Sequence, residues 1–178
     1  IDIGGPTIIR AAGKNFSDVA VVVDPTDYEW IAERIVADEE TVTVSTFLTH
    51  NERKGLAAKA FQHVALYDTQ ITRYLSDGGN LSGTEMTLGY IKRHDLRYGE
   101  NSHQVASVYE DPMSSGGIIG ADHLHGTELS FNNVLDADTA WRVVSDFSEP
   151  AATVVKHTNP CGLALHPDQP TAYRRALE

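Results

Sequence analysis

Two short runs of β-branched and small apolar residues set the fold class of this chain of 178 residues. Residues 19–23 and 151–155 are each long enough for one buried strand and too short for a helix, and polar residues follow each run at once. We predict a buried strand at each, the first of them parallel. Helical patterns surround them at 7–12, 28–37, 51–75, 136–147 and 171–178. The combination favours an α/β fold.

A polar, glycine-rich stretch at residues 76–83 is the best candidate for a linker. After it come short strand patterns, at 84–90, 105–109 and 118–119. We therefore predict two partial domains, residues 1–83 and 84–178. The chain starts with Ile1 rather than Met and stops at Glu178 in a helical pattern, so we expect it to be an internal segment of a longer protein.

The charge balance narrows the classes of partner. The chain has 14 Lys and Arg against 25 Asp and Glu, a net charge of −11, and a nucleic-acid surface needs a concentrated basic stripe. We expect no nucleic-acid partner, although a local pocket can still bind a small anion. No apolar run approaches the roughly 20 residues that cross a bilayer, so we expect no membrane partner. With one cysteine, Cys161, the chain has no internal disulfide, and a cytoplasmic location is expected.

Lys156 and His157 stand directly after the second apolar run. In open α/β sheets ligands bind beyond the carboxyl ends of strands. A histidine there can accept a proton near neutral pH, and a lysine can stabilise negative charge on a carbonyl oxygen. The pair therefore suits transfer of an acyl-type group to an amine. By itself, however, it fits a polar strand end in water better than a site.

Two further clusters are rich in polar side chains. Residues 96–104 contain Arg97, which can clamp a phosphate or carboxylate, and Tyr98, which can stack or donate; the alternative is a solvated loop. Residues 128–133 end in Asn132 and Asn133, ahead of the helix predicted from residue 136. Two asparagines can bind a polar ligand there, but capping of the helix is the better expectation.

Together these blocks resemble one family, the bifunctional phosphoribosylaminoimidazolecarboxamide (AICAR) formyltransferase/IMP cyclohydrolases. The resemblance is carried by Arg-Tyr-Gly-Glu-Asn at 97–101 with His-Gln at 103–104, by Glu-Leu-Ser-Phe-Asn-Asn at 128–133 with Asp-Ala-Asp at 136–138, and by Val-Lys-His-Thr-Asn-Pro-Cys-Gly at 155–162. Upstream, residues 2–5 and 10–15 are similar to the family's cyclohydrolase block. Four blocks in the family's order cover essentially the whole chain.

For the formyltransferase, the resemblance implies that the 5-amino group of AICAR ribotide attacks the formyl carbon of 10-formyltetrahydrofolate, a co-substrate. His157 would be the general base. Lys156 would stabilise charge or donate a proton to the leaving N10. The nucleotide would be held by Arg97 and Tyr98, with His103 and Asn133 also near the substrate.

For the cyclohydrolase, the resemblance implies closure of the carboxamide nitrogen onto the new formyl group to give IMP. Asp2 would orient or deprotonate the amide, and Lys14 would stabilise the carbonyl oxygen. Ile3 and Gly4 would offer backbone contacts to the base.

The resemblance also implies the fold and the partners. The chain would hold the end of a methylglyoxal-synthase-like parallel-sheet domain followed by the start of a cytidine-deaminase-like α/β transformylase domain. It would bind AICAR ribotide, formyl-AICAR ribotide and IMP, require no metal, and act as a homodimer with the transferase site between subunits.

There are departures and alternatives. Ser102 stands where the family has Pro, and Gly13 where it has Ala, which weakens the helix end by up to ~1 kcal/mol. Upstream and downstream regions that the family's two sites need are absent, so a non-catalytic nucleotide-binding or assembly fragment is the main alternative. A Cys161-dependent hydrolase and a metal site at His123 and His125 are weaker ones.

Overall fold

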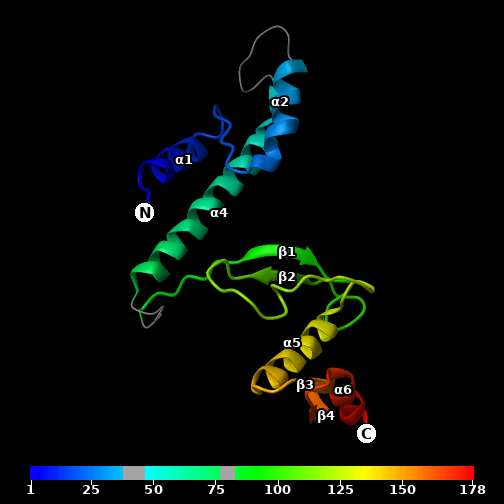
Figure 1. Ribbon diagram of the computed structural model, residues 1–178. Coiled ribbons are helices and arrows are strands. Elements are labelled where there is room, and N and C mark those ends of the chain that lie inside the picture. The colour runs from blue at the N-terminus through cyan, green and yellow to red at the C-terminus, as the bar shows by residue number, and fades with distance from the viewer. Residues whose placement is uncertain (38–46, 77–82) are drawn as a thin grey trace. The chain divides into compact units, whose positions relative to one another are not determined.

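The structure, a computed structural model, describes residues 1–37, 47–76 and 83–178, which form two units, Ile1–Gly89 and Tyr90–Glu178. Helices occur in both units, and the strands of the described residues lie in the second (Figure 1). The chain is thus an α/β protein, as predicted. Most of the predicted linker, 77–82, lies outside the described residues, and the predicted domain boundary between residues 83 and 84 stays a prediction.

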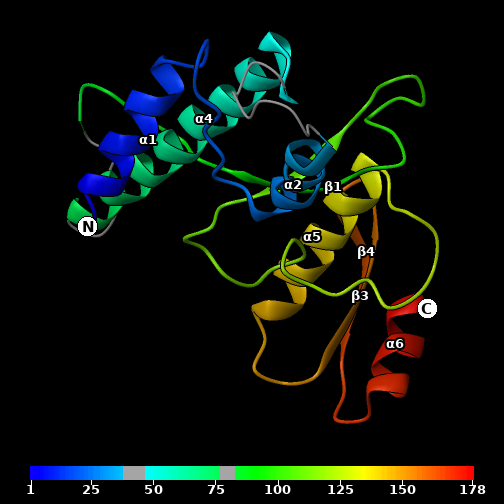
Figure 2. The same ribbon diagram turned by 90° about the horizontal axis from the view of Figure 1, so that it is seen from above.

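The first unit is built on helix α4 (His50–Leu75). The sequence predicts a helix here over residues 51–75. At its start Thr49 and Glu52 form a capping box that satisfies free N–H groups. Helix α1 (Gly4–Lys14) lies alongside α4 in both views (Figures 1 and 2). The two pack closely at Gly13, because a Cβ there would stand 3.1 Å from the Phe61 ring.

Helix α2 (Tyr28–Ala37) has the bounds that its periodicity predicts. Its Ile31 is buried with Leu48 and Leu56. Before it, Asp24 caps a short 3₁₀ turn, Pro25–Asp27. Lys59 on α4 binds both carboxylates of that turn, with Nζ 3.1 Å from Asp24 Oδ2 and 2.7 Å from Asp27 Oδ2. The ion pairs tie this turn to α4.

The strand predicted at residues 19–23 is wrong. The segment has no regular secondary structure, and no strand lies beside it among the described residues. The segment still contributes to the hydrophobic core, because Val21 is buried against Ala57 and Ala60 of α4. An apolar run of this length indicates that its side chains are buried. It does not show whether they pack on a helix or pair in a sheet.

The second unit contains two antiparallel pairs of strands. The first pair is β1 (Ile91–Asp95) with β2 (Ser107–Glu110), the second β3 (Ala151–Lys156) with β4 (Asn159–Leu165). The strands predicted at 84–90 and 118–119 are wrong, since neither segment is a strand. The apolar residues of 84–90 stay largely exposed, and pairing begins only at Ile91.

Two helices pack on the β3–β4 hairpin. They are α5 (Phe131–Ser145) and α6 (Gln169–Leu177), and Figure 2 shows the hairpin between them. Gly162 of β4 lets α6 approach, because a Cβ there would lie far inside contact distance of the Ala176 carbonyl. Helix α5 begins five residues before the predicted start, at a Ser130 capping box that the sequence analysis did not identify.

Candidate functional site

Lys156 and His157 lie at a tight hairpin turn. Lys156 is the last residue of β3 and pairs with Asn159, the first residue of β4. The two residues between them, His157 and Thr158, have φ values of 52° and 59°. Two positive φ values in succession are those of a type I′ turn, which normally takes Asn-Gly. The chain therefore reverses at His157 into an antiparallel partner strand, β4.

Three hydrogen bonds hold this turn. Thr158 donates from Oγ1 to the His157 carbonyl at 2.7 Å, and Asn159 donates from Nδ2 to the same carbonyl at 2.7 Å. The third comes from helix α5: the backbone N–H of Thr158 donates to Asp136 Oδ1 at 2.7 Å. The side chains of Lys156 and His157 stay exposed, so both can reach a ligand.

Arg97 and Tyr98 form a stacked pair after β1. The guanidinium carbon lies 4.9 Å from the ring centroid, and Arg97 Nη2 donates to the phenolic oxygen at 3.2 Å. This hydrogen bond, helped by a second from Ser130 and by the positive charge of Arg97, lowers the pKa of Tyr98. The pair presents a cation and an aromatic hydroxyl side by side, which suits a phosphate and a ribose or base.

The loop that carries this pair is folded against the block at 128–133. Arg97 N–H donates to the Leu129 carbonyl at 2.9 Å, and Phe131 N–H donates to the Tyr98 carbonyl at 3.1 Å. Asn132 adds a bond from Nδ2 to the Glu100 carbonyl, at 3.1 Å. Glu100 and Asn132 are 32 residues apart in the sequence, yet hydrogen bonds hold their two blocks together. The alternative of a solvated loop does not describe it.

His103 lies on the outer turn of that loop. The turn is closed by Gln104 N–H donating to the Asn101 carbonyl at 3.0 Å. Gly99 is required beneath it, because a Cβ would stand 2.8 Å from the Cβ of Gln104. The His103 side chain is exposed, and in the described part of the chain it forms no hydrogen bond or ion pair with the other predicted site residues.

Asn133 caps helix α5. Its Oδ1 accepts from the Ser130 backbone N–H at 3.0 Å and from the Ser130 hydroxyl at 2.8 Å. The expected capping role is therefore confirmed for Asn133, the N3 partner of the Ser130 cap, whereas Asn132 donates to the Glu100 carbonyl. The cap uses only Oδ1, which leaves the Nδ2 donors outside it.

The three blocks meet along the first two turns of α5. Ser130 contacts the Tyr98 hydroxyl and caps the helix with Asn133; one turn later, Asp136 holds the His157–Thr158 turn. Arg97, Asn133 and the Lys156–His157 pair were predicted as site residues, whereas Ser130 and Asp136 were not. The spacing of Ser130 and Asn133, three residues apart as in a capping box, could have identified the cap.

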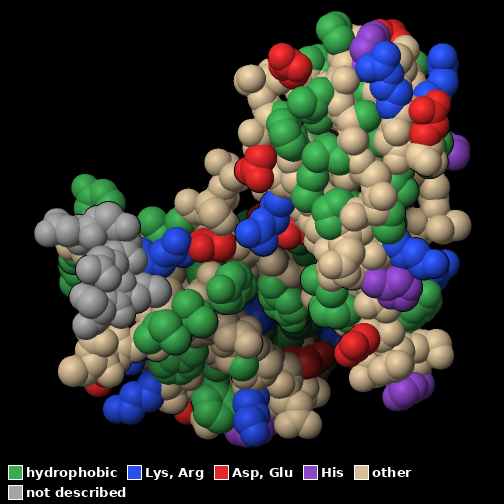
Figure 3. Space-filling view, turned by 90° about the horizontal axis from the view of Figure 1, so that it is seen from below, with side chains coloured by type: hydrophobic (Ala, Val, Ile, Leu, Met, Phe, Trp, Pro, Cys, Tyr) green, Lys and Arg blue, Asp and Glu red, His purple; other side chains and the backbone are tan. Residues whose placement is uncertain are grey.

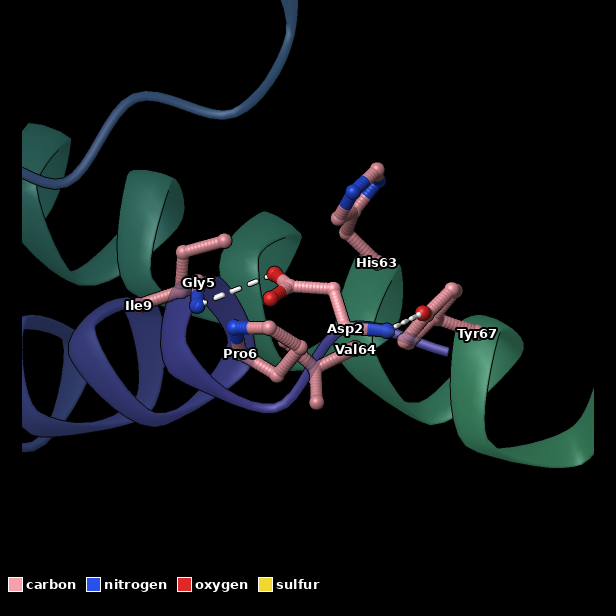
Figure 4. A pocket seen from close by; sticks show the side chains of 7 residues that line it. All are labelled: Asp2, Gly5, Pro6, Ile9, His63, Val64 and Tyr67. Atoms are coloured by element: carbon pink, nitrogen blue, oxygen red, sulfur yellow. Dashed lines mark hydrogen bonds between the residues drawn. The ribbon is translucent and has the colours of Figure 1, made fainter. Parts of the chain in front are cut away.

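Asp2, Ile3 and Gly4 lie at the start of α1 in the first unit. Asp2 Oδ2 accepts from the Gly5 backbone N–H at 3.0 Å, and the Asp2 backbone N–H donates to the Tyr67 hydroxyl at 2.6 Å (Figure 4). Asp2 borders a pocket of about 180 Å³ whose lining comes from α1 and α4: Asp2, Gly5, Pro6, Ile9, His63, Val64 and Tyr67. The carboxylate and two polar side chains of α4 thus share one cavity.

Lys14 lies at the other end of α1. It lies ten residue steps along the helix from Gly4, about 15 Å at 1.5 Å per step. Ile3 is exposed and precedes the first turn. The structure therefore brings Asp2, Ile3 and Gly4 together and does not bring Lys14 to them. His63 and Tyr67 line the same pocket as Asp2 and were not singled out from the sequence, although they lie four residues apart on one helix face.

The weaker alternatives gain no support from the structure. Cys161 is exposed on β4 and its thiol contacts the Asn159 carbonyl, with Sγ 3.6 Å from the oxygen. His123 and His125 lie in an irregular segment, and within residues 1–37, 47–76 and 83–178 no group of three side chains is arranged to hold a metal ion. Over the same ranges no helix is both long and apolar enough to cross a bilayer.

Comparison with known proteins identifies the family. Residues 12–178 match the model of the AICARFT/IMPCHase bienzyme. The chain belongs to this family.

Its relatives are similar along the whole chain. A bifunctional purine biosynthesis protein PurH of Thermoanaerobacter sp. is 47% identical over 179 residues, which are 100% of this chain and 34% of the relative. The purH protein of Dictyostelium discoideum is 44% identical over 199 residues, 99% of this chain and 36% of the relative. The PurH of Halalkalibacterium halodurans is 46% identical over 180 residues, with 100% and 34% covered. The chain therefore spans about a third of the length of these bienzyme relatives.

Proposed function

We propose that this chain supplies the Lys156–His157 formyl-transfer centre of an AICAR formyltransferase/IMP cyclohydrolase. The observation that carries the proposal is the convergence of three blocks, at 97–98, 130–136 and 156–158, on the start of α5. Membership of the bienzyme family and relatives named as bifunctional purine biosynthesis proteins support it.

In the proposed reaction, the 5-amino nitrogen of AICAR ribotide forms a bond to the formyl carbon of 10-formyltetrahydrofolate. His157 takes the proton that the attacking amine loses. Lys156 stabilises the negative charge on the carbonyl oxygen and gives a proton to N10 as the C–N10 bond breaks. Both side chains are exposed at the end of one hairpin, where two reactants can reach them.

The nucleotide is proposed to lie over the Arg97–Tyr98 pair. The Arg97 guanidinium offers two parallel N–H donors to a phosphate. His103 and the Nδ2 group of Asn133 are proposed as further polar contacts. Asn133 can donate from Nδ2 while its Oδ1 remains in the helix cap.

The first unit is proposed to belong to the cyclohydrolase site. Asp2 is the residue best supported, because it borders the pocket of Figure 4 and can orient or deprotonate the carboxamide. Ile3 and Gly4 offer backbone contacts beside it. Lys14 is proposed to stabilise the carbonyl oxygen. Because Asp2 and Lys14 lie at opposite ends of α1, this role requires a bound substrate that contacts both ends of the helix.

The finer fold and assembly are also proposals. We infer a methylglyoxal-synthase-like domain over residues 1–83 and a cytidine-deaminase-like transformylase domain over 84–178. Further inferences are a cytoplasmic homodimer, 10-formyltetrahydrofolate as co-substrate, and no need for a metal, nucleic acid or membrane. Large hydrophobic side chains at the surface, such as Val105 at 97% and Leu124 at 91% exposed, are consistent with burial by more protein. Figure 3 shows hydrophobic side chains reaching the surface on the face it presents.

A chimera tests the proposal. The chain replaces the matching third of the Thermoanaerobacter relative, and formyl transfer from 10-formyltetrahydrofolate to AICAR ribotide is measured for the chimera and for the chain alone. Turnover by the chimera supports the proposal. A folded chimera that binds AICAR ribotide without turnover favours the alternative of a non-catalytic nucleotide-binding or assembly fragment.

A further inference from the structure

The turn at His157 has an unfavourable backbone. Its two central residues both have positive φ, 52° and 59°, and neither is glycine. Thr158 is β-branched, and side chains of that kind rarely adopt the left-handed region. Such a conformation persists only where neighbouring groups hold it in place.

Of the three hydrogen bonds at the turn, two are local. They run from Thr158 Oγ1 and Asn159 Nδ2 to the His157 carbonyl, so they bend the turn without fixing it against the rest of the unit. The third bond fixes it: Asp136, on α5, accepts the Thr158 N–H at 2.7 Å. A bond to a charged acceptor is roughly twice as strong as one between neutral groups.

Asp136 also lies on the same helix as the residues that contact the Arg97–Tyr98 loop. Ser130, Asn133 and Asp136 follow one another at three-residue spacing, so each is the helical neighbour of the next. The first two cap the helix, Ser130 also acts on the Tyr98 hydroxyl, and Asp136 holds the turn. The start of α5 is therefore a rigid spacer between the two proposed halves of the site.

We propose that Asp136 is a positioning residue: through the Thr158 N–H it fixes the His157 turn at a set place relative to the Arg97–Tyr98 loop. The expected effect of Asp136 on formyl transfer rests on the proposed function. The expected effect of Asp136 on the geometry of the turn does not depend on it. Displacing a catalytic group by about 1 Å can lower a rate about 100-fold, so the bond has a kinetic consequence.

The test uses three variants. Asp136→Ala removes the acceptor, and Asp136→Asn keeps an oxygen at the same position. Asp138→Ala is the matched control, because it removes a carboxylate from the same helix that takes part in none of the three bonds of the turn. Amide hydrogen exchange at Thr158 is measured by NMR in the 178-residue chain. The kcat and KM for formyl transfer are measured in the chimera.

Asp136→Ala is expected to speed exchange at the Thr158 amide by about tenfold or more. It is expected to lower kcat about 10- to 100-fold while KM for AICAR ribotide stays within about threefold. Asp136→Asn is expected to keep the Thr158 exchange rate and kcat close to wild type. If the alanine variant does not fold, the asparagine variant is used for the test instead. Asp138→Ala behaves as wild type.

Unchanged exchange at Thr158 in Asp136→Ala overturns the inference, as does an equal effect of Asp138→Ala. A kcat that stays within about twofold of wild type overturns the kinetic part. If the wild-type chimera transfers no formyl group, the proposed function fails. The exchange measurement, which needs no turnover, then still decides whether Asp136 holds the turn.

Discussion

The guanidinium of Arg97 stacks over the ring of Tyr98 and donates a hydrogen bond to its phenolic oxygen, with 3.2 Å between Nη2 and the oxygen. This bond is the largest reason why the pKa of Tyr98 is lowered, because it favours the phenolate. The neighbouring Ser130 contributes a smaller effect in the same direction.

Arg97→Met is therefore expected to raise the pKa of Tyr98 toward its ordinary value. The measurement is a pH titration of ¹³C-labelled tyrosine by NMR, with Tyr98→Phe to assign the signal. Lys92→Met is the control, since Lys92 pairs with Asp95 at 2.6 Å instead. An unchanged titration of Tyr98 in Arg97→Met would show that the stacked pair does not form in solution.

The Lys59 ion pairs predict a change in acid stability. Bonds from Lys59 and then Trp30 lower the pKa of Asp27, while Asp24, held mainly by Thr26, has a pKa of about 2. A lowered carboxyl pKa stabilises the fold above the ordinary value of 3.8, and that contribution is lost as pH falls through the folded-state pKa. The same bonds raise the pKa of Lys59, so its contribution is also lost in strong base.

Lys59→Met is expected to destabilise the first unit at neutral pH, and the difference from wild type should shrink between about pH 5 and about pH 2. Urea unfolding at a series of pH values measures it. Lys54→Met removes an exposed lysine from the same helix and serves as control. A difference that stays constant down to the acid end argues against the ion pairs as its cause.

Asn133 has two separable roles in this account. Asn133→Ala should destabilise the second unit by about 1 kcal/mol, because the Ser130 N–H loses its acceptor. Asn133→Asp keeps an acceptor, and its negative charge suits a helix N-terminus, so stability should stay near wild type. The aspartate variant lacks the Nδ2 donors and should bind AICAR ribotide more weakly. Unfolding curves and calorimetric titration separate the two effects, and nucleotide affinity equal to wild type in Asn133→Asp removes Asn133 from the site.

Alanine substitution at two glycines is predicted to change the stability of the fold in opposite directions. At Gly162 a Cβ would overlap the Ala176 carbonyl, so Gly162→Ala should destabilise the second unit by about 2 kcal/mol or more. At Gly55, inside α4, a Cβ meets nothing within 4 Å, and Gly55→Ala should stabilise the first unit by up to about 1 kcal/mol. Thermal unfolding of both variants checks this, and a tolerated Gly162→Ala is incompatible with the close packing of α6 on β4.

Helices were the part of this fold that sequence patterns predicted well. The bounds of α2, and nearly those of α4, follow from the periodicity of apolar residues. Strand pairing was not predictable in the same way, because pairing depends on a distant partner rather than on local residues. The run at 19–23 shows this, since its Val21 is buried against helix α4 rather than in a sheet.

The hairpin at His157 shows a second limit. Proline and glycine commonly mark turns, but the structure places Pro160 and Gly162 in β4, where the register shifts between Val154 and Val155. Proline is tolerated at such irregularities. The true turn, His157-Thr158, lacks the Asn-Gly pair that normally signals one, so the local sequence does not indicate its position. Strand pairing and the tertiary bond to Asp136 hold it there.

The most direct test of the central claim is the rate of formyl transfer by the chimera after loss of either member of the Lys156–His157 pair. We predict that His157→Ala and Lys156→Ala each lower kcat by about 100-fold or more, with AICAR ribotide binding nearly unchanged. The Thr158→Ser variant, which alters a neighbouring side chain and keeps the backbone N–H, should retain most activity. Transfer near the wild-type rate in both alanine variants would contradict the assignment of this hairpin as the catalytic centre.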